Sequence, residues 1–396
     1  MTSKPPSGPT NGLANIRPAI ASLRPQGISD ISIYGEQFDD VIPLWYGESD
    51  LPTPDIPRRA LIDSLNNGDT FYQAESGRTD LREAIAAYDN RLHGKPIEPD
   101  RITVTASGMT ALHVALQTIC DTGDNVVLVT PVWPNADGAV AVMGAEPRRV
   151  ALHYGDDGFW RLDLDRLFDA CDSRTKALFI NSPNNPTGWM ASAAELSAIL
   201  DFARDRGIWV IADEVYKRIV FDQDVSPSFL DICEPEDLVF AVDSFSKSWA
   251  MTGWRLGWLT APPSLFKTLG SVVQLTNSNS PAFIQAGGLA AIQQCEPFVH
   301  EFRDYCAAGR DIVMDVLGGV NRIQISPPQA AFYAFFAIEG ETDSMALAQR
   351  LVREAGVGVA PGISFGDDSE GWIRLCFAQE PVLLRTAVER IAAMLR

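Results

Sequence analysis

Short apolar runs alternate with longer amphipathic stretches from about residue 55 to residue 260 of the chain. Each run is nearly continuous in apolar residues, as expected of strands that are buried on both faces of a sheet. Most stretches between them have helical spacing, for example 191–207, whose terminal Gly207 suits a helix C-cap. The predicted strands are 101–106, 125–130, 176–181, 208–213, 238–243 and 256–260.

This alternation predicts an α/β fold in which a mainly parallel sheet lies between helices. In such sheets, ligands bind outside the carboxyl ends of the strands. Polar and glycine-rich clusters follow or close five of the predicted strands: SGMT, PVWPN, SPNNPTG, DEVY and SFSK. We therefore expect one pocket that is built from all five clusters.

The pattern changes after about residue 290, where helices alternate with β-rich runs at 330–338 and 371–378. We expect a smaller α+β domain made of residues 16–55 and 290–396, beside a large domain of residues 56–289. The first 15 residues begin MTSKPPSGPTNG and predict a flexible polar arm rather than a signal peptide.

Composition narrows the class of partner. A net charge of -19 argues against nucleic acid or an anionic membrane surface as the main partner. No apolar run reaches the length of a membrane span. The six cysteines lack CxxC spacing, which favours reduced thiols in a cytoplasmic protein. The four histidines form no cluster with cysteine, so we expect no metal site.

Ser107, Gly108 and Met109 lie where a predicted strand turns into an amphipathic helix. Free backbone N–H groups and the helix dipole favour an anion at that point. A plain serine N-cap followed by a turn glycine is the commoner explanation of the same residues.

Four further side chains could contact one ligand, although three of them also have a structural explanation. Asp213 ends a buried strand, and its carboxylate needs a partner, either a protonated ring nitrogen of a ligand or an arginine. Tyr216 could reach the same ligand through its hydroxyl. Asn185 could donate an amide hydrogen to a ligand oxygen, or simply belong to a turn. Trp133 offers a flat apolar face, but a core tryptophan is more usual.

Lys247 lies in SFSKSWAMTGWRLGW, among small hydroxyl residues and three tryptophans. A lysine whose pKa is lowered in an apolar pocket can form a Schiff base with an aldehyde. Ser244 and Arg255, which are close in sequence, could both hold a phosphate. An exposed loop lysine is the alternative, and it fits poorly with the neighbouring tryptophans.

Together these groups match pyridoxal phosphate piece by piece: phosphate ligands, an acid for a pyridinium, a hydroxyl and an amide for a phenolic oxygen, a stacking ring and an amine. The chain resembles the class I/II aminotransferases, a family of fold-type I pyridoxal-phosphate enzymes. The resemblance covers roughly residues 30 to 390 and rests on eight motifs in order. They are YQAESGRTDLREAI (72–85), SGMTAL (107–112), PVWPN (131–135), NNPTG (184–188), DEVY (213–216), SFSKSWAMTGWRLGW (244–258), APGISFG (360–366) and RLCFA (374–378).

The resemblance implies a role for each residue at the cofactor ring. Lys247 forms the Schiff base with the cofactor aldehyde and, once released by substrate, moves the proton between Cα and C4′. Asp213 keeps the ring nitrogen protonated, so that the ring accepts electrons. Tyr216 and Asn185 bind the phenolic oxygen, and Trp133 stacks on the ring.

The resemblance also assigns the remaining contacts. Arg374 grips the α-carboxylate of the substrate, with Asn185 and the backbone of Gly47 in the same substrate site. Tyr72 reaches the phosphate of the neighbouring subunit, which implies a homodimer with shared active sites. The phosphate within the subunit is held by Ser107, Gly108, Met109, Ser244 and Arg255.

Two departures from the pattern of aspartate-specific relatives bear on substrate choice. Where some carry a lysine for the distal carboxylate this chain has Met109, and where others carry a histidine it has Ala136. We therefore expect a ping-pong aminotransferase that moves the amino group of an L-amino acid to a 2-oxo acid such as 2-oxoglutarate. We expect the enzyme to prefer slightly an amino donor with a neutral or aromatic side chain.

Three alternatives remain. The first two are an aspartate aminotransferase and a carbon–sulfur β-lyase on the same fold, since both would use the same cofactor site. The third is a regulatory protein with an aminotransferase-like domain. It is disfavoured because too few residues precede the first motif for a DNA-binding module and the chain is too acidic.

Overall fold

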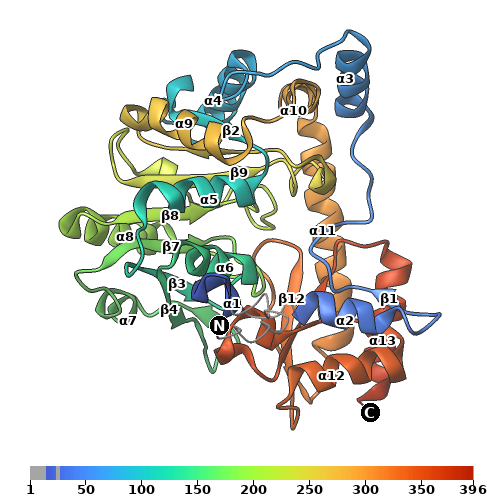
Figure 1. Ribbon diagram of the computed structural model, residues 1–396. Helices are drawn as coiled ribbons and strands as arrows, with labels where there is room; N and C mark the ends of the chain where they lie inside the picture. Colours follow the sequence, from blue (N-terminus) through green and yellow to red (C-terminus); the bar gives the residue numbers. More distant parts are fainter. Residues whose placement is uncertain (1–14, 24–26, 396) are drawn as a thin grey trace, which may run out of the picture.

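A seven-stranded sheet lies at the centre of the larger part of the molecule (Figure 1). The structure is a computed structural model, and it describes residues 15–23 and 27–395. Every strand pair in this sheet is parallel except those of β10, which is antiparallel to both of its neighbours. In spatial order the strands are β2 (Ile102–Thr105), β10 (Gly257–Thr260), β9 (Val239–Ser244), β8 (Trp209–Asp213), β7 (Thr175–Asn181), β3 (Asn125–Thr130) and β4 (Glu146–Ala151).

All six predicted strands belong to this sheet, so the predicted α/β fold is confirmed. The prediction missed the edge strand β4. Its sequence, EPRRVA, carries three charged residues, and only Val150 is fully buried. An edge strand needs no continuous apolar run, because one side of it faces solvent.

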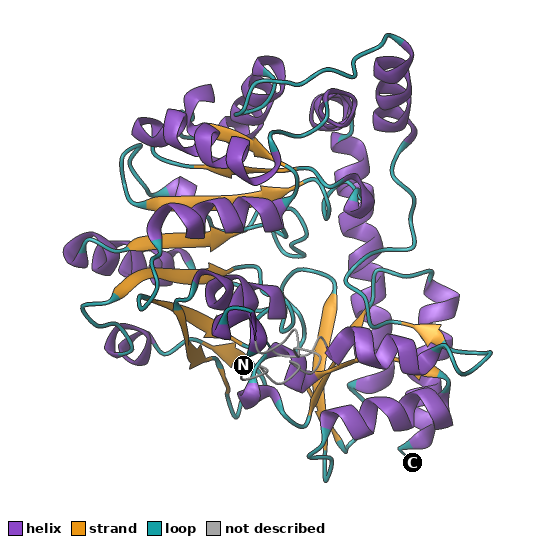
Figure 2. Ribbon diagram, in the orientation of Figure 1, coloured by secondary structure: helices purple, strands orange, loops and turns teal. Residues whose placement is uncertain are grey.

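Helices cover both faces of the sheet (Figure 2). One face packs on α5 (Gly108–Ile119), α6 (Pro134–Met143) and α9 (Phe266–Asn277) through residues such as Val126 and Leu128. The other face packs on α4 (Thr79–His93), α8 (Ala193–Arg206) and α10 (Ala282–Gln294) through residues such as Val127 and Val129. Because successive side chains point to opposite faces, burial of both faces explains the continuous apolar runs.

Helix α8 shows why the sequence marks its ends so clearly. Ser192 and Glu195 form a capping box at its start, in which each side chain accepts from the backbone of the other. At its end, Gly207 takes a left-handed conformation with φ 64°, as the predicted C-cap requires.

The remainder of the chain builds a four-stranded antiparallel sheet with its own apolar core. Its strands, in spatial order, are β11 (Ile323–Ile325), β12 (Tyr333–Ile338), β15 (Trp372–Cys376) and β14 (Ala360–Pro361). The helices around it are α2 (Gly27–Gly35), α11 (Glu296–Leu317), α12 (Ser344–Arg350) and α13 (Pro381–Met394).

Residues from near the N-terminus complete this second unit. Strand β1 (Ile42–Pro43) pairs in parallel with β13 (Val357–Gly358). Just after β1, Trp45 packs so closely on Gly35 and Gly358 that neither position has room for a side chain. The domain boundaries themselves stay a prediction, and residues 1–14 of the expected arm lie outside the described residues.

The remaining α-helices and strands of the described chain are α1 (Pro18–Ala21), α3 (Asp55–Asn66), α7 (Leu164–Asp169), β5 (His153–Tyr154) and β6 (Trp160–Arg161). Helix α3 packs against α10, and α1 lies against α6. A short hairpin of β5 and β6 precedes α7.

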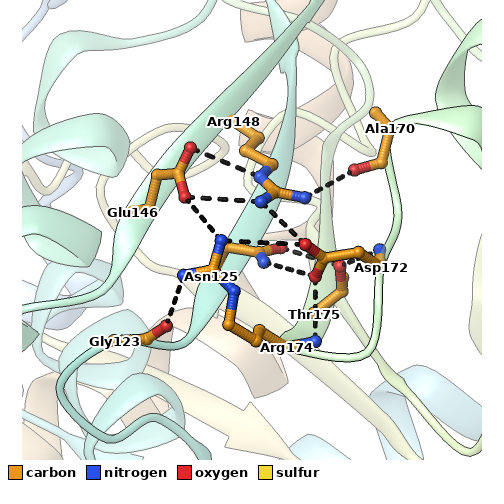
Figure 3. A network of polar contacts seen from close by, with 8 residues as sticks. All are labelled: Gly123, Asn125, Glu146, Arg148, Ala170, Asp172, Arg174 and Thr175. Atoms are coloured by element: carbon orange, nitrogen blue, oxygen red, sulfur yellow. Dashed lines mark hydrogen bonds and ion pairs between the residues drawn. The ribbon is translucent and has the colours of Figure 1, made fainter.

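A polar network ties the amino ends of β3, β4 and β7 together (Figure 3). Asp172 is at its centre: one carboxylate oxygen accepts from Nδ2 of Asn125 at 2.9 Å, and the other pairs with Nη2 of Arg148 at 2.9 Å. These contacts, with the backbone N–H of Arg174, lower the pKa of Asp172 well below its usual value. The network braces the end of the sheet opposite to the one at which the predicted ligand clusters gather.

Candidate active site

A cavity of about 420 Å³ opens where the carboxyl ends of the large-sheet strands face the smaller sheet. Its lining draws on β8, β9, the first turn of α5 and the start of α6, together with residues near β1 and on β12 and β15. Eleven of the thirteen predicted site residues line it: Gly47, Gly108, Met109, Trp133, Asn185, Asp213, Tyr216, Ser244, Lys247, Arg255 and Arg374. The single pocket expected from the sequence is therefore present.

Backbone groups and hydroxyls meet at the first turn of α5. Ser107 is the N-cap, and its Oγ accepts from the backbone N of Thr110 at 3.0 Å, so the capping explanation is correct for that side chain. A side chain at Gly108 would meet Cβ of Ser244 at 3.3 Å, which shows how near β9 approaches this turn. Ser244 lines the cavity beside Arg255, whose Nη1 donates to the carbonyl of Thr252 at 2.6 Å. This end of the cavity suits an anion.

Asp213 ends β8 with a buried carboxylate that lacks a charged partner. Its Oδ1 has no hydrogen-bond partner among the described residues, and no lysine or arginine of those residues forms an ion pair with it. Burial raises the pKa of Asp213 to about 7, and the backbone N–H of Val215 and the ammonium of Lys247 oppose that rise. The structural ion pair considered for Asp213 is not formed, so the carboxylate is free to hold a cationic group of a ligand.

Lys247 points its ammonium into the cavity. Nζ donates to the carbonyl of Gly47 at 2.6 Å and lies 5.6 Å from the ring centre of Tyr216. Burial lowers the pKa of Lys247 to about 8, and the nearby guanidinium of Arg374 acts in the same direction. An exposed loop lysine is ruled out, and the amine is deprotonated far more readily than an ordinary lysine.

Arg374 on β15 is held rigidly although it is buried. Nη1 donates to Oδ1 of Asn185 at 3.0 Å, and Nη2 donates to the carbonyl of Trp45. The guanidinium carbon lies over two aromatic rings, 4.6 Å from the ring centre of Tyr333 and 4.9 Å from the ring centre of Phe365. Its Nε has no partner among the described residues. A planar fork fixed in this way suits a carboxylate.

Tyr333 is a cavity residue that sequence reasoning missed. Its hydroxyl lies 2.8 Å from the hydroxyl of Tyr216, and burial raises the pKa of both phenols. The same hydroxyl touches Gly47 so closely that a side chain there would collide with it. The only signal in the sequence was a tyrosine within the apolar run 330–338, which core packing explains equally well.

Two predicted residues lie differently. Neither Ser107 nor Tyr72 lines the cavity: Ser107 is buried, and Tyr72 has 88% of its surface exposed. Trp133 lines the cavity and is half-buried, so it is not a core residue. The two positions at which the chain departs from aspartate-specific relatives also differ in their surroundings. Met109 lines the cavity, whereas Ala136 is buried in the apolar core.

The described residues contain no group of three or more histidine, cysteine or acidic side chains that could bind a metal ion. Within the same part of the chain, no helix combines the length and apolarity that crossing a bilayer needs.

Comparison with known proteins identifies this architecture. The model of the family "Aminotransferase class I and II" matches residues 39–391. A probable aspartate/prephenate aminotransferase of Aquifex aeolicus is 35% identical over 89% of this chain and 90% of its own length. An aspartate aminotransferase variant of Thermus thermophilus superposes with a TM-score of 0.89 at 30% identity, covering 96% of this chain and 99% of its own. An aromatic aminotransferase of Pyrococcus horikoshii superposes with a TM-score of 0.85 at 31% identity, over 92% and 98%.

The fold and these matches define a fold-type I transaminase. The chain belongs to the class I and II aminotransferase family and is a pyridoxal-phosphate-dependent enzyme. The cavity fits this cofactor, because an unpartnered buried carboxylate, a lysine of lowered pKa and a helix N-terminus line one space. Bound there, pyridoxal phosphate supplies the aldehyde that takes the amino group and the ring that accepts electrons.

Proposed function

We propose that the protein moves the amino group of an L-amino acid to a 2-oxo acid, such as 2-oxoglutarate, by a ping-pong mechanism. The observation that carries this proposal is the shared cavity of Lys247, Asp213 and Arg374. Lysine supplies a nucleophilic amine, aspartate a partner for a pyridinium, and arginine a fork for a carboxylate. Transamination needs all three groups at one site.

The chain's own residues then have separate tasks. Lys247 Nζ carries the proton that leaves the substrate Cα. The carboxylate of Asp213 holds the ring N–H, and the hydroxyl of Tyr216 with the amide of Asn185 binds the phenolic oxygen. Trp133 covers the ring.

The two ends of the bound molecules are held by other groups. Arg374, with Asn185 and the Gly47 backbone, orients the substrate carboxylate. The phosphate is bound at the turn of Ser107, Gly108 and Met109, and by Ser244 and Arg255.

The donor side chain is the finer part of the proposal: neutral or aromatic side chains are slightly preferred. The cations that line the described cavity are Lys247, Arg255 and Arg374, and each already has a task. The remaining wall near α5 includes Met109 and Leu112. Burying an apolar side chain there gains about 1.5–3 kcal/mol, whereas a carboxylate would be buried without a partner. The named relatives include both aspartate and aromatic aminotransferases, so family membership leaves this choice open.

We also propose a cytoplasmic homodimer in which Tyr72 completes the phosphate site of the partner subunit. Tyr72 is 88% exposed and its neighbour Phe71 is 79% exposed, which is unusual for two adjacent aromatic side chains. Leu275, on α9, is 88% exposed. A second copy of the chain would cover this apolar surface. The six cysteines are free thiols, as a reducing compartment requires.

A half-reaction screen tests the proposal. The purified holoenzyme is mixed with each amino acid in turn, and conversion of the bound cofactor to its pyridoxamine form is followed by absorbance. We expect phenylalanine and leucine to be converted at least as efficiently as aspartate and glutamate. A preference for aspartate of a hundredfold or more, about 2.7 kcal/mol, would contradict the neutral pocket. Release of ammonia and pyruvate from cysteine conjugates, without pyridoxamine, would identify a β-lyase instead.

A further inference from the structure

Lys217 is a second buried lysine near the active site, one residue after Tyr216, but it does not line the cavity. Its Nζ lies 2.8 Å from Oδ1 of Asp89 and 2.8 Å from Oδ2 of Asp243. Only 3% of its side chain is exposed, and the ring of Trp258 lies 5.7 Å from the ammonium. The contact joins three parts of the large unit: helix α4, the turn after β8 and the end of β9.

The ammonium stays charged at neutral pH despite its depth. Burial opposes the charge, but the carboxylates of Asp243 and Asp89 outweigh that effect and raise the pKa of Lys217. Burial raises the pKa of Asp243, and the ammonium of Lys217 limits that rise. Removing the lysine would leave two buried carboxylates without their cation, which is costly. The group is therefore held together as a unit.

Asp243 links this unit to the active site. The oxygen of Asp243 that does not face Lys217, Oδ1, accepts the backbone N–H of Ser244 at 2.6 Å. The hydroxyl of Ser244 lies 2.8 Å from Oγ of Ser246, in the turn that leads to Lys247, and 3.2 Å from the carbonyl oxygen of Leu256, and it can donate to one of them at a time. Both carboxylate oxygens of Asp243 are thus engaged, one by the ammonium and one by the turn.

Asp89 differs from Asp243 in one respect that a test can use. It contacts Lys217 through Oδ1, but its Oδ2 has no partner among the described residues. It lies on α4, and among the described residues its side chain hydrogen-bonds to Lys217 and not to the turn of Ser244. Both carboxylates therefore pair with Lys217, but only Asp243 also accepts a hydrogen bond from Ser244, which lines the cavity.

We propose that Lys217 is a positioning residue for the cofactor phosphate, because through Asp243 it holds the backbone of Ser244 and so places the Ser244 hydroxyl at the phosphate end of the cavity. This inference rests on the proposed position of the phosphate at Ser244. It makes Lys217 and Asp243 necessary for binding the phosphate, not for the chemistry at the ring.

Phosphate binding can be measured separately from the rest of the cofactor. Pyridoxal has the same ring as pyridoxal phosphate but no phosphate. We therefore take the ratio of the dissociation constant of pyridoxal to that of pyridoxal phosphate, and the change in this ratio from wild type to variant reports on the phosphate. For the apoprotein of Lys217→Met, we expect the dissociation constant of pyridoxal phosphate to rise at least about tenfold. The constant for pyridoxal should change less than about twofold. General loosening of the fold would weaken both alike.

Two further variants separate positioning from stability. Asp243→Ala leaves Lys217 paired with Asp89, so no buried charge loses its only partner. It should lower the ratio of dissociation constants as Lys217→Met does. It also serves if Lys217→Met does not fold. Asp89→Asn should lower the thermal unfolding temperature but leave the ratio of dissociation constants unchanged. Lys176→Met, at a lysine that is 44% exposed, is the matched surface control.

Ser244→Ala distinguishes failure of this inference from failure of the proposed phosphate site. If Ser244→Ala leaves the ratio unchanged, the phosphate is not at Ser244 and the site proposal fails. If Ser244→Ala lowers the ratio while Lys217→Met and Asp243→Ala do not, Lys217 has no positioning role. If Asp89→Asn lowered the ratio as much as Lys217→Met does, the inference would also fail. A carboxylate that is not hydrogen-bonded to the turn of Ser244 would then be as important for phosphate binding as Asp243.

Discussion

The guanidinium of Arg374 donates to the side-chain oxygen of Asn185 across 3.0 Å, inside the cavity that also contains Lys247. With its oxygen turned to Arg374, the amide of Asn185 keeps its NH₂ group free to donate to a ligand oxygen. The backbone N of Asn185 donates to Oδ1 of Asn181 at 2.8 Å, which fixes the turn. The group proposed for the substrate carboxylate and the group proposed for the phenolic oxygen therefore orient each other.

Arg374→Lys should raise KM for the amino donor by about ten- to a hundredfold, with a much smaller change in kcat. Lysine keeps the charge but loses the planar fork, the bond to Asn185 and the contacts of the guanidinium with two aromatic rings. Steady-state kinetics with saturating oxo acid measures the split, and the thermal unfolding temperature serves as the control for folding. An unchanged KM would mean that the donor carboxylate binds elsewhere.

Asp213→Asn should reduce transamination by at least about a hundredfold, because a neutral amide cannot stabilise a pyridinium. The same change should stabilise the apoprotein at alkaline pH. Burial raises the pKa of Asp213 to about 7, so between about pH 4 and pH 7 the folded state binds a proton that the unfolded state has lost. The free energy of unfolding of the native apoprotein therefore falls as pH rises through this window.

Denaturant unfolding of both apoproteins at pH 5 and pH 8 checks the second part. The stability advantage of the Asn variant should be larger at pH 8, by up to about 1.4 kcal/mol for each pH unit within the window. An equal difference at the two pH values would show that Asp213 titrates normally. Near-normal half-reaction rates in the variant would make the carboxylate merely structural.

Tyr72→Ala and Lys247→Ala should complement each other when their subunits exchange. In a mixed dimer, one site combines an intact Lys247 with the intact Tyr72 of the other subunit. Random exchange predicts that about a quarter of wild-type activity returns. Mass spectrometry of differently tagged subunits confirms exchange, and absence of recovery despite exchange would remove Tyr72 from the neighbouring site.

Asp172 lies at the centre of the polar network at the amino ends of the strands (Figure 3) and does not line the cavity. Asp172→Asn should therefore lower the thermal unfolding temperature at pH 7 and leave the turnover number unchanged. The network holds the pKa of Asp172 below its usual value, so its stabilisation is present above the unfolded pKa and is lost as pH falls below about 4. The difference from wild type should shrink accordingly in acid. Asp205→Asn, at an exposed position on α8, is the matched control.

The sheet and most of the cavity could be predicted because their signals are local. Strands buried on both faces are continuous in apolar residues, and the residues after them must lie at one edge. The edge strand β4 has no such run, and Tyr333 reaches Tyr216 only through the packing of two sheets. Lys217 was equally hidden, because its carboxylate partners are 128 and 26 residues away in the chain.

Lys247 as the amine that binds the cofactor is the central claim, and trapping tests it most directly. The holoenzyme is reduced with borohydride, digested and mapped by mass spectrometry, with an untreated sample as the control. We predict that the pyridoxyl phosphate adduct is on Lys247, within the peptide that contains SFSKSWAMTGWR. An adduct on any other lysine, Lys217 included, or none after the cofactor has been added, would contradict the account.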